Sequence, residues 1–83
     1  MSEHHRISAE VDARGTRCPI PLLRAKQALK SLNVGERIKV LATDPSAKGD
    51  FDAMLSHLPH WLVDYQVEND DVSVHVFVIE KGL

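Results

Sequence analysis

Residues 62–79 read LVDYQVENDDVSVHVFVI, two runs rich in β-branched and aromatic residues around a turn-forming centre. Such residues favour extended backbone, so we predict β-strands over residues 62–67 and 72–79. Asn69, Asp70 and Asp71 are residue types that favour turns. The chain is therefore expected to end in a β-hairpin.

Upstream of this hairpin, the chain twice shows a strand followed by a helix. Alternating apolar residues predict strands over residues 7–13 and 38–42, and helical spacing predicts helices over residues 19–32 and 46–58. Asp44 or Ser46 is placed to cap the second helix, and Pro59 is expected to end it. The apolar helix positions are Leu22, Ala25, Leu29 and Leu32, then Phe51, Met54, Leu55 and Leu58.

The resulting order, β-α-β-α-β-β, defines the expected fold class, which is α+β. Two amphipathic helices on one face of a four-stranded mixed sheet would bury both apolar stripes in a two-layer α/β sandwich. We expect one domain over residues 1–83, with residues 1–6 as a flexible N-terminus.

Composition and charge limit the class of protein. Of the 83 residues, 43% are hydrophobic and 27% are charged, as in ordinary soluble domains. The N-terminus lacks the apolar stretch of a signal peptide and no apolar run is long enough to span a bilayer, so a reducing, cytoplasmic location is expected. The net charge of −2 argues against nucleic acid as the main partner.

Charge is unevenly distributed along the chain. Residues 1–48 carry nine Lys or Arg against five Asp or Glu, whereas residues 49–83 carry one Lys against seven Asp or Glu. Cys18 lies in the positive part, which favours a thiolate and an acidic partner surface. The alternative is that the two parts of the chain form ordinary solvated surfaces that happen to differ in charge.

Cys18 is the only cysteine, and it lies in Arg17-Cys18-Pro19-Ile20-Pro21 at the predicted start of the first helix. With Cys18 as the cap, Pro19 and Pro21 fix the first turn, and the N–H groups of Ile20 and Leu22 are free to face the sulfur. The helix dipole, with Arg14 and Arg17 nearby, then favours a thiolate or a persulfide anion.

The alternative for Cys18 is a buried cysteine that packs as a small apolar side chain. In either case a single cysteine excludes an internal disulfide and a metal site made of cysteines alone. Sulfur chemistry at Cys18 must therefore finish on another molecule.

The run Asp12-Ala13-x-Gly15-x-Arg17-Cys18-Pro19-x-Pro21 resembles the signature of the TusA sulfur-carrier family. The resemblance continues through Gly35-Glu36, Thr43-Asp44-Pro45, Asp50-Phe51 and residues 77–82. It implies a small β-α-β-α-β-β protein without a cofactor, in which Cys18 carries sulfur as a persulfide. Arg14, Gly15, Arg17, Pro19 and Pro21 would support the geometry of the motif.

The resemblance also implies partners. A cysteine desulfurase or a rhodanese-type donor would load Cys18, and an acceptor protein would collect the sulfur for tRNA thiolation, molybdenum-cofactor metabolism or sulfur oxidation. Such a protein is a carrier rather than a catalyst, a monomer that forms transient complexes. The main alternative is a thiol-sensing or binding module with the same fold. A third is a peroxide-reducing enzyme, although no polar constellation near the thiol in the sequence suggests one.

The remaining candidates each have a structural alternative. Arg24 and Lys26 could form a docking patch or a solvated helix face, and Asp44 could orient the Cys18 loop, meet a partner or start a turn. The same alternatives apply to Asp50, for which a structural role is expected. Glu80 stands where some relatives have arginine, which could change the partner that docks. His57 and His60 are expected to interact with a helix dipole, since no third ligand supports a metal. Trp61 is expected in the core or at its edge.

Overall fold

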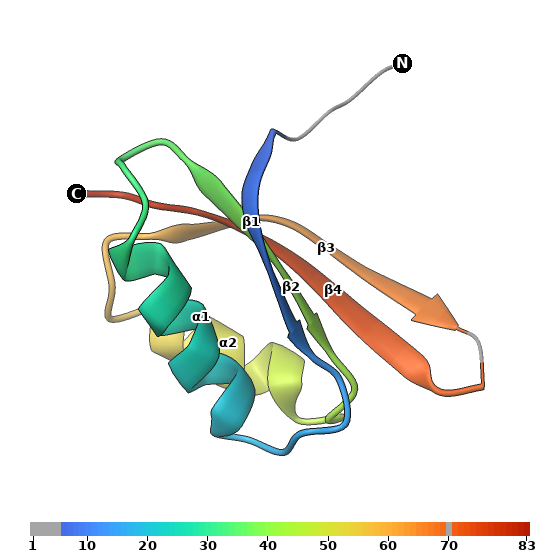
Figure 1. The fold of residues 1–83 in the computed structure, drawn as a ribbon. Coiled ribbons are helices and arrows are strands. Elements are labelled where there is room, and N and C mark those ends of the chain that lie inside the picture. Colours follow the sequence, from blue (N-terminus) through green and yellow to red (C-terminus); the bar gives the residue numbers. More distant parts are fainter. Residues whose placement is uncertain (1–5, 70) are drawn as a thin grey trace.

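The computed structural model describes residues 6–69 and 71–83, and Figure 1 shows its arrangement. Residues 1–5 of the expected N-terminal segment and Asp70 of the hairpin turn lie outside the described residues. The elements, in chain order, are β1 (Ile7–Ala13), α1 (Ile20–Lys30), β2 (Arg37–Ala42), α2 (Ala47–Leu55), β3 (Trp61–Asn69) and β4 (Ser73–Glu80).

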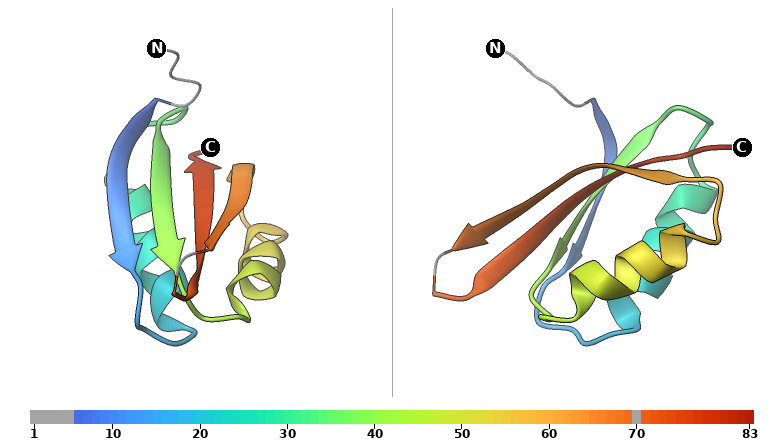
Figure 2. Two further views of the ribbon diagram at one scale, coloured as in Figure 1. Left: turned by 90° about the vertical axis from the view of Figure 1, so that its right-hand side faces the viewer. Right: turned by 180° about the vertical axis from the view of Figure 1, so that it is seen from behind.

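The four strands form one sheet in the order β1-β2-β4-β3, with β1 and β2 parallel and the other neighbours antiparallel. Both helices cover the same face of this sheet, as the two views of Figure 2 show. The predicted two-layer α+β sandwich with a mixed sheet is confirmed. The parallel pair matters for the site because its two strands end at the same edge of the sheet.

The core lies between the sheet and the two helices. Phe77 and Ile79 of β4 are fully buried, as are Ile38 and Val40 of β2. The ring of Phe51 on α2 stacks on that of Phe77 with a centroid distance of 4.4 Å, and Tyr65 of β3 lies 5.1 Å from Phe77. Aromatic contact therefore joins α2 to the C-terminal hairpin.

Both helices end earlier than the apolar periodicity predicts. In α2 the last helical residue is Leu55, four residues before Pro59. The N–H of His57 donates to the carbonyl of Met54, and that of Leu58 to Leu55, which is the tighter 3₁₀-type pattern. Leu58 thus keeps roughly helical spacing outside the α-helix, which explains why the pattern overestimates the helix length.

Trp61 was expected in the core or at its edge. Its side chain is 55% exposed at the start of β3, so the core itself is excluded. Its ring lies beside the C-terminal segment at Gly82, where it shields backbone rather than filling the core.

Gly82 is the position where the backbone packs most tightly. A Cβ atom there would lie 1.5 Å from the carbonyl oxygen of Pro59, so the two backbone segments would have to separate. We expect Gly82→Ala to lower the free energy of unfolding by about 1–3 kcal/mol, measured by urea titration.

Gly49→Ala is the matched control for this prediction. Gly49 lies within α2, and no atom stands within 4 Å of its would-be Cβ. Because alanine favours helix, this substitution should raise the free energy of unfolding by about 0.5–1 kcal/mol. Equal stability of the Gly82→Ala variant and the wild type would contradict the close packing at Pro59.

Candidate functional site

Cys18 lies in the loop between β1 and α1, at the edge of the sheet where β1 and β2 end. Its side chain is half-buried, and its peptide bond to Pro19 is cis. The N-cap of α1 is Pro19, one residue later than predicted, and Pro21 is the second residue of the helix. Pro19 is exposed whereas Pro21 is buried, so one proline faces solvent beside the cysteine and the other fixes the helix on the core.

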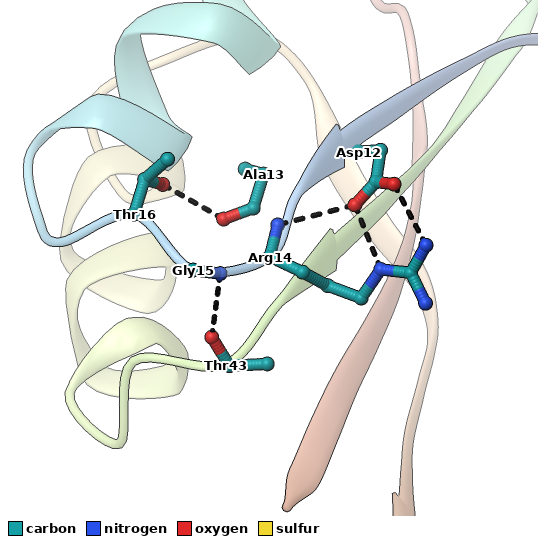
Figure 3. Close-up of polar contacts among 6 residues, drawn as sticks. All are labelled: Asp12, Ala13, Arg14, Gly15, Thr16 and Thr43. Atoms are coloured by element: carbon teal, nitrogen blue, oxygen red, sulfur yellow. Dashed lines mark hydrogen bonds and ion pairs between the residues drawn. The ribbon is translucent and has the colours of Figure 1, made fainter.

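The loop that carries Cys18 is tied to the loop that follows β2. The N–H of Gly15 donates to Thr43 Oγ1 at 2.9 Å, and Thr16 Oγ1 donates to the carbonyl of Ala13 at 2.7 Å (Figure 3). Gly15 has a φ of +80°, a conformation that favours glycine. The motif's glycine therefore allows the turn that brings Cys18 over the end of β2.

Asp44 fixes the backbone at Cys18. Its Oδ2 accepts the Cys18 N–H at 2.8 Å, and its Oδ1 accepts the N–H of Ser46 at 2.9 Å and the Ser46 hydroxyl at 2.8 Å. These three hydrogen bonds lower the pKa of Asp44 below its ordinary value, and the bond from the Cys18 N–H contributes most. Asp44 thus both orients the Cys18 loop and starts the turn before α2. A contact of Asp44 with a partner stays a prediction.

Carboxylates also act on the thiol. Hydrogen bonding to Asp50 of α2, partial burial and the negative charges of Asp50 and Asp44 raise the pKa of Cys18 to about 11. This pKa shift is opposite in direction to the one that the helix start predicts, and it favours the neutral thiol at neutral pH.

Two assumptions behind the thiolate prediction fail. The N–H of Ile20 donates to the carbonyl of Arg17 at 2.9 Å and not to the sulfur. The guanidinium of Arg14 binds Asp12, with Nε 2.8 Å and Nη2 2.7 Å from its carboxylate oxygens, as Figure 3 shows. This pairing holds the pKa of Asp12 at about 2, so the charge of Arg14 is directed at Asp12.

Two apolar side chains, Ile20 and Leu23, are site residues that sequence reasoning missed, whereas for Asp50 the sequence predicts a structural role. Asp50 precedes Phe51, which points into the core, and successive helix residues differ by about 100° in direction. Asp50 can therefore face the Cys18 loop rather than the sheet. Ile20 and Leu23, in the first turn of α1, are 44% and 52% exposed. They place apolar surface next to the cysteine loop.

The basic candidates are exposed on or near α1. Arg17 and Arg24 face solvent, and the charge of Arg24 contributes to the lowered pKa of Asp12. Lys26 is also exposed and lies toward the far end of the helix from Cys18. There it borders an open pocket of about 170 Å³ whose lining residues are Lys26, Leu29, Lys30, Leu58, His60 and Lys81.

Glu80 lies at the other end of the sheet from Cys18. Glu80 is paired in register with Arg37, the first residue of β2. The Cys18 loop lies beside the last residue of β2, about 17 Å along the strand from Arg37. Its Oε1 is 2.9 Å from Arg37 Nη2 and 3.0 Å from Nε. The acidic residue at this position is thus matched by a cation within the sheet.

His57 lies in the turn directly after α2, so its interaction with the helix dipole stays a prediction. His60 instead precedes β3, where its Nδ1 accepts the N–H of Gly82 at 2.9 Å. Burial, with the nearby charge of Lys81, lowers the pKa of His60. In residues 6–69 and 71–83, no three His, Cys, Asp or Glu side chains are grouped to hold a metal, and no helix could cross a membrane.

Asp44 makes a testable contribution to acid stability. Its pKa in the folded protein lies below the ordinary value of 3.8, so the stability it adds is present above about pH 4 and is lost as the pH falls through the folded value. We expect Asp44→Asn to reduce the loss of stability on acidification from neutral pH. Urea titrations at neutral pH and near pH 3 would measure it, and an unchanged acid dependence would contradict this role.

The fold and the site define a class, that of small α+β proteins with a thiol held at the start of a helix, at the edge of a mixed sheet. Comparison with known proteins gives the family. Residues 9–81 match the family model described as Sulfurtransferase TusA. The chain belongs to the TusA family.

Individual relatives agree with this assignment. The chain is 41% identical to the sulfur carrier protein TusA of Allochromatium vinosum, over 88% of this chain and 92% of that protein. It is 38% identical to the sulfur carrier protein TusA of Pseudomonas fluorescens, over 92% and 88%. A solved SirA-like protein from Desulfitobacterium hafniense has the same fold, with a TM-score of 0.70, 29% identity and coverage of 86% of this chain and 95% of that one.

Proposed function

We propose that this protein is a sulfur carrier that holds sulfane sulfur as a persulfide on Cys18 and relays it to an acceptor protein. The observation that carries the proposal is a half-exposed thiol in a chain with no second cysteine, on a loop whose backbone is fixed by the hydrogen bond from the Cys18 N–H to Asp44. The sulfur carrier proteins among the relatives support it. The expected setting is the reducing cytoplasm.

The transfer balances without an oxidant. The sulfur of Cys18, after loss of its proton, attacks the outer sulfur of a donor persulfide; the donor's S–S bond breaks, its thiolate leaves, and a new S–S bond forms on Cys18. An acceptor thiolate then attacks that outer sulfur and releases the Cys18 thiolate. We propose a cysteine desulfurase or rhodanese-type protein as donor, with tRNA thiolation, molybdenum-cofactor metabolism or sulfur oxidation as the use.

Partner docking would use the surface next to Cys18. Ile20 and Leu23 offer exposed apolar area there, and Arg24 and Lys26 add positive charge along the same helix. Apolar anchors with a charged rim are the usual elements of a transient interface. An acidic partner surface fits this arrangement.

The raised pKa of Cys18 argues against the peroxide-reducing alternative. Such an enzyme needs a thiolate to attack peroxide, and here the neighbouring Asp50 and Asp44 carboxylates raise the pKa of the Cys18 thiol. A carrier differs, because it reacts within a complex where the donor can contribute groups to the reaction. The remaining alternative, a thiol sensor, differs from a carrier in not giving sulfur away.

Discharge of sulfur distinguishes the carrier from the sensor. The protein is loaded with a desulfurase and cysteine, separated from the donor, and mixed with an excess of a protein thiol. We expect the outer sulfur to move to the acceptor and the carrier to return to its original mass, followed by intact-mass spectrometry of both proteins. Sulfur that stays on Cys18 while the acceptor gains none would contradict the carrier function.

A further inference from the structure

We propose that Thr43 and Ser46 are positioning residues for sulfur transfer at Cys18. They act through hydrogen bonds that hold the Cys18 loop against the turn between β2 and α2, and neither needs to touch the transferred sulfur. This inference rests on the proposed sulfur-carrier function. It assigns a role to two hydroxyl side chains that lie on either side of the Asp44-Pro45 pair in the sequence.

The Cys18 loop is held at two points. The N–H of Gly15 donates to Thr43 Oγ1 at 2.9 Å, and the N–H of Cys18 donates to Asp44 Oδ2 at 2.8 Å. Two consecutive residues after β2 thus bind two positions of the loop that lie three residues apart. Because this segment is short and bound at both ends, its place relative to the turn is fixed.

Ser46 determines how the Asp44 carboxylate is oriented. The Ser46 hydroxyl and N–H donate to Asp44 Oδ1 at 2.8 and 2.9 Å, so Oδ2 is left to accept the Cys18 N–H. The carbonyl of Asp44 accepts the N–H of Ala47, the first residue of α2, at 3.0 Å. Both the side chain and the backbone of Asp44 are therefore anchored at the start of α2, and the Cys18 loop is anchored with them.

Fixing the Cys18 amide restricts the sulfur. The amide nitrogen is three bonds from Sγ, so with the backbone in place only rotation about the Cα–Cβ bond moves the sulfur, among staggered positions. Transfer needs a partner's sulfur aligned with that position, and a fixed geometry of the reacting groups raises the rate within a complex. Thr43 and Ser46 therefore act on the rate of transfer rather than on the binding of the partner.

A pocket beside the loop gives Thr43 a competing role. This open pocket of about 290 Å³ is lined by Gly15, Thr16, Arg17, Thr43, Asp44 and Pro45. If a partner segment occupied it, loss of the Thr43 hydroxyl would weaken partner binding. Rate and binding are therefore measured separately in the test.

The test compares Thr43→Val and Ser46→Ala with Thr43→Ser and Ser56→Ala. Valine has nearly the shape of threonine without the hydroxyl, and Thr43→Ser keeps the hydroxyl as the conservative rescue. Ser56 directly follows α2, and its hydroxyl donates to the carbonyl of Ala53 at 2.7 Å. Ser56→Ala thus removes a serine hydroxyl bond at the other end of the same helix and is the matched control.

The first readout is amide hydrogen exchange measured by NMR. Loss of a hydrogen bond should speed exchange roughly threefold to tenfold, at Gly15 in Thr43→Val and at Cys18 in Ser46→Ala. In Ser46→Ala the pKa of Asp44 should also rise toward its ordinary value, because the Ser46 hydroxyl, after the N–H groups of Cys18 and Ser46, helps to lower it. Thr43→Ser and Ser56→Ala should match the wild type at both amides.

The second readout separates rate from binding. Each protein is mixed with an excess of a cysteine desulfurase charged with cysteine, at several desulfurase concentrations, and the gain in mass at Cys18 is followed in time. We expect the rate at saturating desulfurase to fall roughly threefold to tenfold in Thr43→Val and Ser46→Ala, while the half-saturating concentration stays at the wild-type value. Thr43→Ser and Ser56→Ala should keep the wild-type rate.

Failure of this inference differs from failure of the proposed function. Unchanged exchange in Thr43→Val and Ser46→Ala, or an unchanged saturating rate, would overturn the positioning role. A rise in the half-saturating concentration alone would also overturn it, and would assign Thr43 to partner binding in the pocket. If both variants exchange faster as expected but no protein, the wild type included, accepts sulfur, the carrier function fails and the positioning role fails with it.

Discussion

Cys18→Ser takes up no sulfur from a desulfurase or from a rhodanese-type donor under conditions that load the wild type; this is the largest functional effect we expect. A serine hydroxyl cannot form the S–S bond, and the chain holds no other cysteine. Intact-mass spectrometry of the variant after incubation with each donor would measure this.

Folding is the control for this variant. Asp44 binds the backbone N–H of residue 18 and not its side chain, so the loop should keep its conformation and the variant its stability. Uptake of sulfur by a folded Cys18→Ser protein would contradict the assignment of Cys18. Loss of uptake together with loss of folding would show instead that the side chain is needed for stability.

Phe77→Ala should have the largest effect on stability. Phe77 is fully buried in β4, stacks on Phe51 at 4.4 Å and contacts Tyr65. Removing a buried phenylalanine ring costs about 3–5 kcal/mol, against a total of about 5–10 kcal/mol for a domain of this size. We expect the urea midpoint to fall to a small fraction of the wild-type value.

Val67→Ala is the matched control in the same hairpin. Val67 belongs to β3 and is 42% exposed, so its truncation should change the free energy of unfolding by less than about 0.5 kcal/mol. A loss below about 1 kcal/mol in Phe77→Ala would contradict the central place of the Phe51–Phe77 stack.

Much of the fold was predictable because each element has a simple periodicity. The alternation in residues 38–42 places Ile38 and Val40 on the buried face, and the spacing of Ala25 and Leu29 gives the buried face of α1. Helix ends were less predictable. The 3₁₀-type turns after Lys30 and Leu55 keep the apolar side chains at nearly the same spacing as an α-helix does.

The site was predictable only in its position. Two prolines and a glycine around Cys18 indicate a rigid turn before a helix, and the structure has one there. The electrostatics depend on tertiary contacts, because packing of α2 brings Asp50 from the acidic part of the chain to a cysteine in the basic part. Charge counted along the sequence could not indicate this.

The pairing of Glu80 shows the same limit. The local sequence suggests only that its charge could change the partner that docks, but the antiparallel register of β2 and β4 sets Glu80 opposite Arg37. That register follows from the strand order, in which β4 lies between β2 and β3. The residues next to Glu80 in the sequence do not indicate that Arg37 is its ion-pair partner.

The central claim is that Cys18 accepts sulfane sulfur, and the mass of the wild-type protein tests it most directly. The protein is incubated with a cysteine desulfurase, cysteine and pyridoxal phosphate, and in parallel with a rhodanese charged with sulfane sulfur. The account predicts a gain equal to one sulfur atom, located on the peptide that contains Cys18 and removed by a reducing thiol. An unchanged mass with both donors would contradict it.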